Sequence, residues 1–254
     1  DQRAIIALAL PLIANSAVQL VLNLTDVWFI GHISTRALAA VSGVHWLAFV
    51  VLLMLSGLGM AVQTVVAQAH GARRQARAAQ AVWIALWGLL LSTPLFLAAG
   101  LSSRWILRPF DLPPGIVDLA AAFWLPRVAG SCFGAGVWAL LGFFNGIGRP
   151  RVTLLVTAVM ATANAVFNEL FIFHWHLGVA GSGLATTVAQ ACGLAIALVA
   201  FLRGHYRRGY RTHLTWTPNL RRIWAQLRIG FPMGLLIAAD LIGFSLLISV
   251  LRNS

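Results

Sequence analysis

The chain contains seven apolar stretches that are each long enough to cross a lipid bilayer, and this feature constrains its fold more than any other. A transmembrane helix needs about 20 mostly apolar residues. The stretches are Ala4–Ile30, Val44–Gln68, Ala81–Leu101, Leu119–Asn145, Val152–His174, Val179–Leu202 and Ile229–Leu251. Porin strands alternate over about ten residues and do not fit these runs. A soluble domain would carry about 25% charged residues, whereas this chain has 9%. The sequence therefore predicts an all-α polytopic membrane protein.

The arginines between the apolar stretches predict the orientation in the membrane. Alternate gaps are rich in arginine, and these gaps hold Arg3, Arg73, Arg74, Arg77, Arg149, Arg151, Arg203, Arg207, Arg208, Arg211, Arg221, Arg222 and Arg228. The remaining arginines are Arg36, Arg104, Arg108, Arg127 and Arg252. Because cytoplasmic loops carry an excess of basic residues, we expect a multi-pass protein of the bacterial inner membrane with a cytoplasmic N-terminus. The net charge of +12 is then a topology signal and does not indicate nucleic-acid binding.

The gaps also predict a division into three parts. Residues 1–202 would form a six-helix transmembrane lobe, residues 203–228 a basic cytoplasmic linker, and residues 229–254 the first helix of a second lobe. The apolar stretches that begin near Leu8–Pro11 and Ile229–Pro232 both have a proline at their entrance, which suggests the duplicated bundles common in transporters. Within the linker, Leu220–Leu227 is either a short amphipathic surface helix or an ordinary loop. We expect the chain to be part of a longer protein, with a C-terminal lobe of the same transporter as its partner.

Polar side chains recur at helical spacing inside several apolar stretches. They comprise Asn15, Gln19, Asn23 and Asp26 in the first; Thr153, Thr157, Asn164, Asn168 and Glu169 in the fifth; Ser182, Thr186, Thr187 and Gln190 in the sixth; and Asp240 in the seventh. Steps of three and four residues place side chains on one helix face. Ionisable groups inside a membrane are costly and typically functional. The pattern predicts facing helices around a hydrated cavity that contains at least one carboxylate.

A carboxylate in such a cavity has two uses for coupling transport to an ion gradient. Burial disfavours its charged form, so it can bind and release a proton. If it stays ionised, it can bind Na⁺ together with amide and hydroxyl oxygens, which suit hard cations. Asp26 is the principal candidate. Simpler structural roles stay open for the others, because amides bond between membrane helices and hydroxyls bond their own backbone. Arg127 could either reach the lipid surface or pair with a carboxylate.

The sequence offers little support for an enzyme. The pair His174 and His176 lacks the Cys or carboxylate neighbours of a metal site, and the Gly181–Gly183 segment lacks the flanks of a nucleophile elbow. The chain has no lysine, and therefore no phosphate-binding loop for ATP. Cys132 and Cys192 lie within apolar stretches, so a disulfide is not expected. An intramembrane enzyme is the alternative outside transport, and we expect no cofactor and no structural metal.

Several motifs, in order along the chain, resemble the multidrug and toxic compound extrusion (MATE) transporters. The first group runs from the start of the chain to the fourth apolar stretch and comprises Leu8–Pro11, Asn23–Asp26, Phe29–His32, Ala37–Val41, Val66–Gly71 and Gly142–Pro150. The second group comprises Asn164–Asn168, Leu170–Phe173, Gly178–Gly181, Ala185–Gln190 and Gly230–Pro232. The Asp26–His32 segment resembles the DinF-like branch of that family.

The resemblance implies a transporter of two six-helix lobes that exports cationic or amphipathic drugs or metabolites in exchange for H⁺ or Na⁺. It implies that Asp26 is the coupling carboxylate, with Asn164 and Asn168 around it, and that Asp240 matches an acidic position of some members. Asn168 stands where many prokaryotic members carry Asp. The remaining cavity candidates are Asn15, Gln19, Asn23, Glu169, Thr186, Thr187 and Gln190. A lipid-linked-oligosaccharide flippase of the same superfamily is the alternative within transport, although it would need a strongly basic cavity.

Overall fold

The computed structural model describes residues 2–108 and 113–253, and within these the side chains at 2–9, 11–12, 43, 45–56, 58, 114, 237–238 and 240–253 lie outside the description. The elements are α1 (Gln2–Ile33), α2 (Thr35–Gly71), α3 (Gln75–Leu101), α4 (Ser103–Leu107), α5 (Pro114–Ala129), α6 (Ser131–Gly146), α7 (Pro150–Asn168), the π-helix η2 (Glu169–His174), α8 (Gly178–Leu202), α9 (Gly204–Gly209) and α10 (Leu220–Asn253). The described residues contain no strand. The predicted all-α fold is confirmed.

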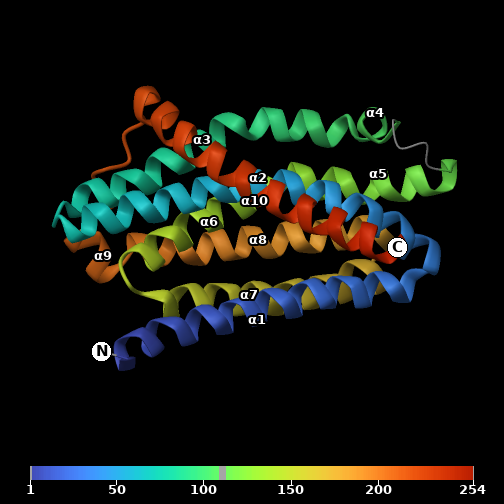
Figure 1. Ribbon diagram of the computed structural model, residues 1–254, viewed down its shortest axis with the longest axis horizontal. Coiled ribbons are helices and arrows are strands. Elements are labelled where there is room, and N and C mark those ends of the chain that lie inside the picture. The colour runs from blue at the N-terminus through green and yellow to red at the C-terminus, as the bar shows by residue number, and fades with distance from the viewer. Residues whose placement is uncertain (1, 109–112, 254) are drawn as a thin grey trace.

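The long helices form a bundle along one axis, with α1 beside α7 at one edge (Figure 1). Next to this pair, α8 packs against α7, α5 and α6, and α6 also packs against α2. The core combines alanines and aliphatic side chains with aromatic ones, including Phe143, Phe144 and Phe201, which are all fully buried. Ser34 separates α1 from α2, and its hydroxyl accepts a 3.0 Å bond from the Ala37 backbone N–H, as a helix N-cap does.

Large apolar side chains cover much of the outer surface. On α1 and α3 they include Ile13, Leu20, Leu24, Leu91 and Leu95, all of which are more than half exposed. Such a surface suits lipid and is unusual for a soluble monomer. Among the described residues, four helices are long and apolar enough to span a membrane, and a bent pair makes a possible fifth. These helices support a multi-pass membrane protein.

The predicted fourth span is two helices, and the expectation of one continuous helix over Leu119–Asn145 is wrong. The axes of α5 and α6 differ by 42° at Gly130. Pro126 precedes the bend and lacks a backbone N–H, which weakens an α-helix locally. At Gly130 itself, an added Cβ would lie 2.2 Å from Thr187 Oγ1. The bend therefore brings the end of α5 into close contact with α8.

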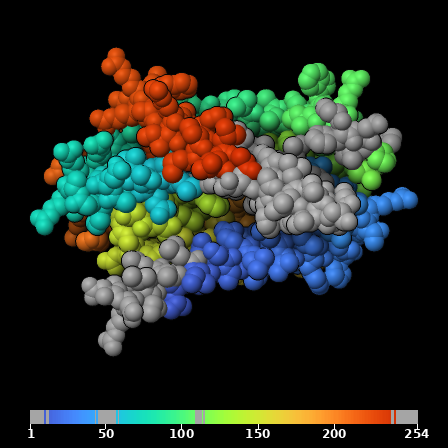
Figure 2. All heavy atoms as spheres, viewed as in Figure 1, coloured from blue at the N-terminus to red at the C-terminus, as the bar shows by residue number. Residues whose placement is uncertain are grey.

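The predicted linker over residues 203–228 also differs in its local structure. Residues Gly204–Gly209 form α9, and Leu220 begins a helix that continues without a break through Ile229. The segment Leu220–Leu227 is thus the first part of α10. Figure 2 shows the described part of α10, in orange and red, lying over α2 and α3, in cyan and teal. Close approach is possible because a Cβ at Gly57 of α2 would lie 2.2 Å from the Gly230 carbonyl oxygen of α10.

Candidate functional site

Asp26 is the buried carboxylate at the centre of the candidate site. It lies near the end of α1 and is only 8% exposed. Its Oδ1 atom accepts a 2.8 Å hydrogen bond from Asn168 Nδ2, and its Oδ2 atom accepts a longer bond of 3.4 Å from Thr186 Oγ1. A carboxylate removed from water needs donors of this kind to compensate for its lost hydration. The structure therefore places Asp26 between helices and away from the surface.

Two asparagines of α7 extend this arrangement. Asn164 and Asn168 are four residues apart, so they share one face of the helix, and both are fully buried. Asn168 Nδ2 also donates to Asn164 Oδ1 at 3.1 Å, and Asn164 Nδ2 donates to Thr186 Oγ1 at 3.2 Å. The side chains of α1, α7 and α8 thus form one hydrogen-bonded cluster, the "Asp26 cluster", consisting of Asp26, Asn164, Asn168 and Thr186.

The Asp26 cluster lies where the α-helical backbone gives way to a π-helix. Asn168 is the last residue of α7, and η2 begins at Glu169. Short π-helical segments are rare and are frequent at functional sites. The wider turn also rotates the following residues relative to Asn168, and Glu169 is exposed. Glu169 therefore does not take part in the cluster that Asn168 forms.

Arg127 supplies a buried positive charge close to the Asp26 cluster. It lies in the last turn of α5, is 8% exposed and attracts Asp26 electrostatically across the bundle. These two are the only buried charged residues in the described part of the chain. The direct ion pair found among the described residues lies elsewhere, on the surface, between Arg104 and Asp118 at 3.0 Å. Of the two roles expected for Arg127, pairing with a carboxylate is the one that this placement supports.

Three polar atoms around this region have no hydrogen-bond partner in the described structure. They are Arg127 Nη1, Asn168 Oδ1 and Ser182 Oγ, the last of which lies one turn before Thr186 in α8. Buried polar groups are almost always satisfied by protein or by water. These atoms are therefore available to bind water or a small ion. The described residues hold no cluster of three or more His, Cys, Asp or Glu side chains, so a bound cation would rely on one carboxylate with amide and hydroxyl oxygens.

The other polar residues of α1 do not belong to the Asp26 cluster. Asn15 is half-buried, and its Oδ1 accepts a 2.6 Å bond from Thr157 Oγ1 of α7. Gln19 is half-buried, but Asn23 is exposed. The reason is the helix pitch of 3.6 residues per turn, which moves each four-residue step about 40° around the axis. Asn23 is thus not brought into the Asp26 cluster.

The remaining candidate residues of α8 and α10 are Thr187, Gln190 and Asp240, and the side chains of the first two make no hydrogen bond to Asp26 among the described residues. Thr187 Oγ1 donates to the Pro126 carbonyl at 2.8 Å and so joins α8 to α5. Gln190 is 8% exposed and packs against Gly134 of α6, where an added Cβ would lie 2.9 Å from its amide. Its Oε1 has no partner in the described structure. Asp240 belongs to α10, but its side chain lies outside the described residues.

The position of Arg127 depends on two close backbone approaches, at Gly130 and at Gly183. Besides Gly130, the backbone at Gly183 of α8 comes so near α5 that an added Cβ would lie 2.7 Å from the Phe123 carbonyl oxygen. One side of α8 therefore faces both α5, at Gly183, and the Asp26 cluster, at Ser182 and Thr186. The sequence signal for this contact is the Gly-Ser-Gly segment together with the proline and glycine that bracket Arg127.

Comparisons with known proteins give a consistent result. The family model MatE matches residues 11–170, which is more than half of the chain. A "Probable multidrug resistance protein NorM" of Agrobacterium fabrum is 28% identical over 96% of this chain and 53% of its own length. A protein of the same description from Pseudomonas aeruginosa is 33% identical, over 92% of this chain and 49% of its own length.

A solved structure described as MATE in the straight conformation superposes with a TM-score of 0.79. It is 25% identical, and the match covers 98% of this chain and 56% of that chain. The present chain thus spans about half the length of the relatives it matches. The expected likeness to the DinF-like branch stays a prediction. Family model, sequence relatives and fold agree, and the chain belongs to the MatE family of transporters.

Proposed function

We propose that the protein exports small organic compounds, mainly cationic or amphipathic ones, across the bacterial inner membrane in exchange for H⁺ or Na⁺. Asp26 is the group that binds the coupling ion. Membership of the MatE family and the names of the relatives support multidrug export. The observation that carries the proposal is the burial of Asp26 among polar side chains of three other helices, with unpartnered polar atoms beside it.

Neutralisation of Asp26 changes its hydrogen bonding with Asn168. An ionised carboxylate only accepts hydrogen bonds, and it is held by the Asn168 amide N–H. A protonated carboxyl can also donate, and its natural acceptor is Asn168 Oδ1, the unpartnered oxygen of the same amide. Rotation of that amide would exchange donor for acceptor. The contact between α1 and α7 thus has two alternative hydrogen-bonding arrangements, one for each state of Asp26.

Arg127 links these two states to the shape of the bundle. With Asp26 ionised, the two buried charges sum to zero. With a proton or Na⁺ bound, the charge of Arg127 is no longer balanced, and an uncompensated buried charge is strongly unfavourable. The loaded protein therefore favours a conformation in which α1, α5 and α7 separate enough to admit water. An ion that binds the two conformations with different affinity shifts their populations, which is the requirement for coupled transport.

A bound Na⁺ would be a transported substrate and would use the oxygens of the Asp26 cluster. The Asp26 carboxylate, Asn168 Oδ1 and the Thr186 and Ser182 hydroxyls are hard oxygen ligands. The flippase alternative receives less support, because Arg127 is the only buried arginine in the described part of the chain, and its charge is balanced by Asp26.

The experiment is efflux from proteoliposomes loaded with a cationic dye. An imposed H⁺ gradient, an imposed Na⁺ gradient and no gradient are compared while the membrane potential is held at zero by K⁺ and valinomycin. Dye efflux that accelerates with one of the two gradients supports the proposal and identifies the ion. Efflux that is equal in all three conditions would overturn ion-coupled export.

A further inference from the structure

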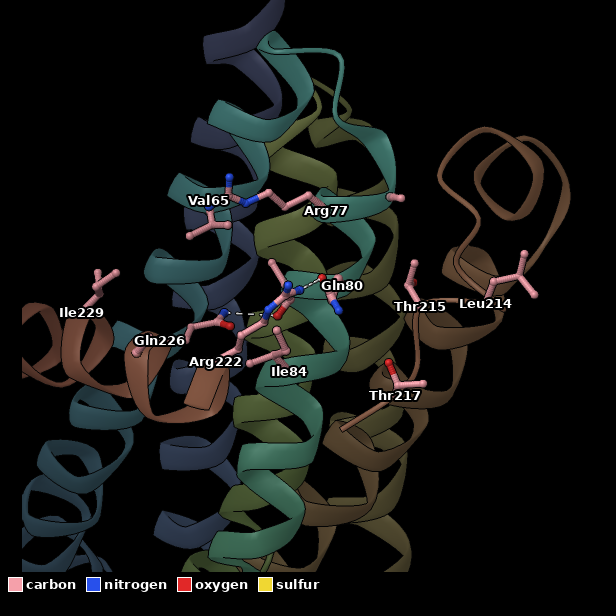
Figure 3. Close-up of a pocket in the computed structure, with 13 residues that line it drawn as sticks. Val65, Arg77, Gln80, Ile84, Leu214, Thr215, Thr217, Arg222, Gln226 and Ile229 are labelled. Atoms are coloured by element: carbon pink, nitrogen blue, oxygen red, sulfur yellow. Dashed lines mark hydrogen bonds between the residues drawn. The ribbon is translucent and has the colours of Figure 1, made fainter. Parts of the chain in front are cut away.

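A polar pocket lies at the arginine-rich end of the bundle, away from the Asp26 cluster. It occupies about 680 Å³ between α3, the start of α10, the segment before α10 and Val65 of α2. Its polar wall includes Arg77, Gln80, Arg222 and Gln226 (Figure 3). Gln226 Nε2 donates to the Ala81 carbonyl at 3.2 Å, and Arg222 Nη1 donates to Gln80 Oε1. These bonds join α10 to α3, and we call this the basic pocket.

The arginines of the basic pocket have no acidic counterpart. Its residues all come from the stretches 27–110 and 170–239, and neither stretch contains an Asp or Glu. The guanidinium of Arg77 makes no hydrogen bond or ion pair with the described residues, and only one of the five N–H donors of Arg222 is used by Gln80. Two guanidinium groups with free donors and no carboxylate favour an anion with several oxygens, and phosphate is the group that arginine binds best in this way.

Apart from two threonines, Thr215 and Thr217, the remaining walls of the basic pocket are apolar. Val65, Ile84 and Ile229 line it, and Ile229 is half exposed. Beyond the pocket, exposed apolar side chains continue along both neighbouring helices, with Leu90 and Leu91 on α3 and Leu235 and Leu236 on α10. A free phosphate or a nucleotide would gain nothing from these surfaces, whereas two acyl chains would.

Four tryptophans near the basic pocket indicate that it lies at the level of the lipid headgroups. The indole N–H of Trp83 donates to the Thr212 carbonyl at 2.7 Å, and that of Trp87 donates to the Trp216 carbonyl at 2.6 Å. These bonds hold the segment before α10 against α3. Trp216 and Trp224 are exposed beside it. Exposed tryptophans gather at the membrane–water interface, so the pocket opens where headgroups lie.

We propose that the basic pocket binds the phosphate of an anionic phospholipid from the arginine-rich side of the membrane. Arg77 and Arg222 bind the phosphate oxygens, and the acyl chains lie along the exposed apolar faces of α3 and α10. Basic pockets between transmembrane helices on the cytoplasmic side bind anionic headgroups in this manner. Because the lipid would contact α3 and α10 together, it would hold the beginning of α10 against the first six spans.

The test is native mass spectrometry of the purified protein titrated with phosphatidylglycerol or with phosphatidylcholine. The wild type is expected to bind phosphatidylglycerol preferentially. The double variant Arg77→Gln/Arg222→Gln is expected to bind it about 30-fold more weakly, since each arginine near the surface contributes about 1 kcal/mol. The matched control is Arg203→Gln/Arg208→Gln, which removes two exposed arginines from the same end of the bundle and is expected to retain the binding. Arg77→Lys/Arg222→Lys keeps the charge but not the paired N–H donors, and it should restore the affinity only in part.

Three outcomes would overturn the proposal. They are undiminished phosphatidylglycerol binding by the Arg77→Gln/Arg222→Gln variant, an equal loss in the control variant, and displacement of the lipid by inorganic phosphate or glycerol 3-phosphate. The last would assign the pocket to a soluble phosphate compound. Binding is measured without transport, so this result is independent of the efflux experiment.

Discussion

Asn168 donates its side-chain amide to the carboxylate of Asp26 at 2.8 Å, and this bond joins the C-terminal part of α1 to the last turn of α7. Both residues are buried, and they are 142 positions apart in the chain. A change in the charge of Asp26 therefore acts directly on the contact between α1 and α7.

Replacement of Asn168 by leucine is expected to impair both stability and coupled efflux. Leucine has a similar size but no hydrogen-bond donor, and loss of a bond to a charged group costs about 1.5–3 kcal/mol. Asn23→Leu is the control, because Asn23 belongs to α1 but is exposed, and it should change stability by less than about 0.5 kcal/mol. Chemical unfolding and dye efflux of the two variants provide the comparison. Equal effects would contradict the special role of Asn168.

The charges of Asp26 and Arg127 should be energetically coupled. In a double-mutant cycle with Asp26→Asn and Arg127→Gln, we expect the double variant to be more stable than the sum of the single losses implies, by about 1 kcal/mol or more. The reason is that each single variant leaves one buried charge unbalanced. The exposed pair Arg104 and Asp118 provides a control cycle with a smaller coupling. Strict additivity at Asp26 and Arg127 would show that the two charges do not interact.

The contact of α5 with α8 should not tolerate even one methyl group at Gly183. An added Cβ would lie 2.7 Å from a backbone oxygen of Phe123, which cannot rotate away, and overpacking typically costs about 1–3 kcal/mol. At Gly31 of α1, a Cβ would have no neighbour within 4 Å, and alanine should there be neutral or stabilising. Melting temperatures of Gly183→Ala and Gly31→Ala in the same detergent test this contrast. Equal melting temperatures would mean that α5 and α8 are less tightly packed.

Tyr210 should make stability sensitive to alkaline pH. Burial raises the pKa of the Tyr210 phenol above its usual value of about 10, with a further increase from Tyr206 and an opposing effect of Arg149. The folded state therefore holds this proton longer than the unfolded state, and its contribution is lost as the pH rises above about 10. Tyr210→Phe removes this dependence and also the 2.8 Å bond to His70, at a cost of about 1 kcal/mol. Unfolding followed from pH 8 to 11 should show a flatter profile for the variant.

Much of this fold could be predicted because the apolar stretches and the arginine-rich gaps between them are visible in short segments of the sequence. The predicted stretch Val179–Leu202 differs from α8 by one residue, Val152–His174 corresponds to α7 together with η2, and Ala81–Leu101 ends where α3 ends. The bend at Gly130 was not predicted, although Pro126 precedes it, because its extent also depends on packing against Thr187 of α8, a helix distant in the sequence. A helix from Leu220 was one of the two alternatives for Leu220–Leu227, but its unbroken continuation into the seventh apolar stretch was not predicted. The contacts that place its start are with Gln80 and Ala81 of α3.

The candidate site could be predicted in part. Helical spacing brought Asn164 and Asn168 together, and the cost of a buried charge identified Asp26. The helix pitch accounts for the exposure of Asn23, but the sequence does not indicate the π-helix that begins at Glu169. The neighbourhood of Arg127 depends on how α5 bends against α8, which is a tertiary effect.

The most direct test of the account is gradient-driven dye efflux by Asp26→Asn compared with Glu169→Gln in proteoliposomes. Both changes remove one carboxylate near the same end of the bundle, but only Asp26 is buried and bonded to Asn168. We expect Asp26→Asn to lose the acceleration by the ion gradient and Glu169→Gln to retain it. Efflux by Asp26→Asn that responds to the gradient as strongly as the wild type would contradict the assignment of Asp26 as the coupling carboxylate.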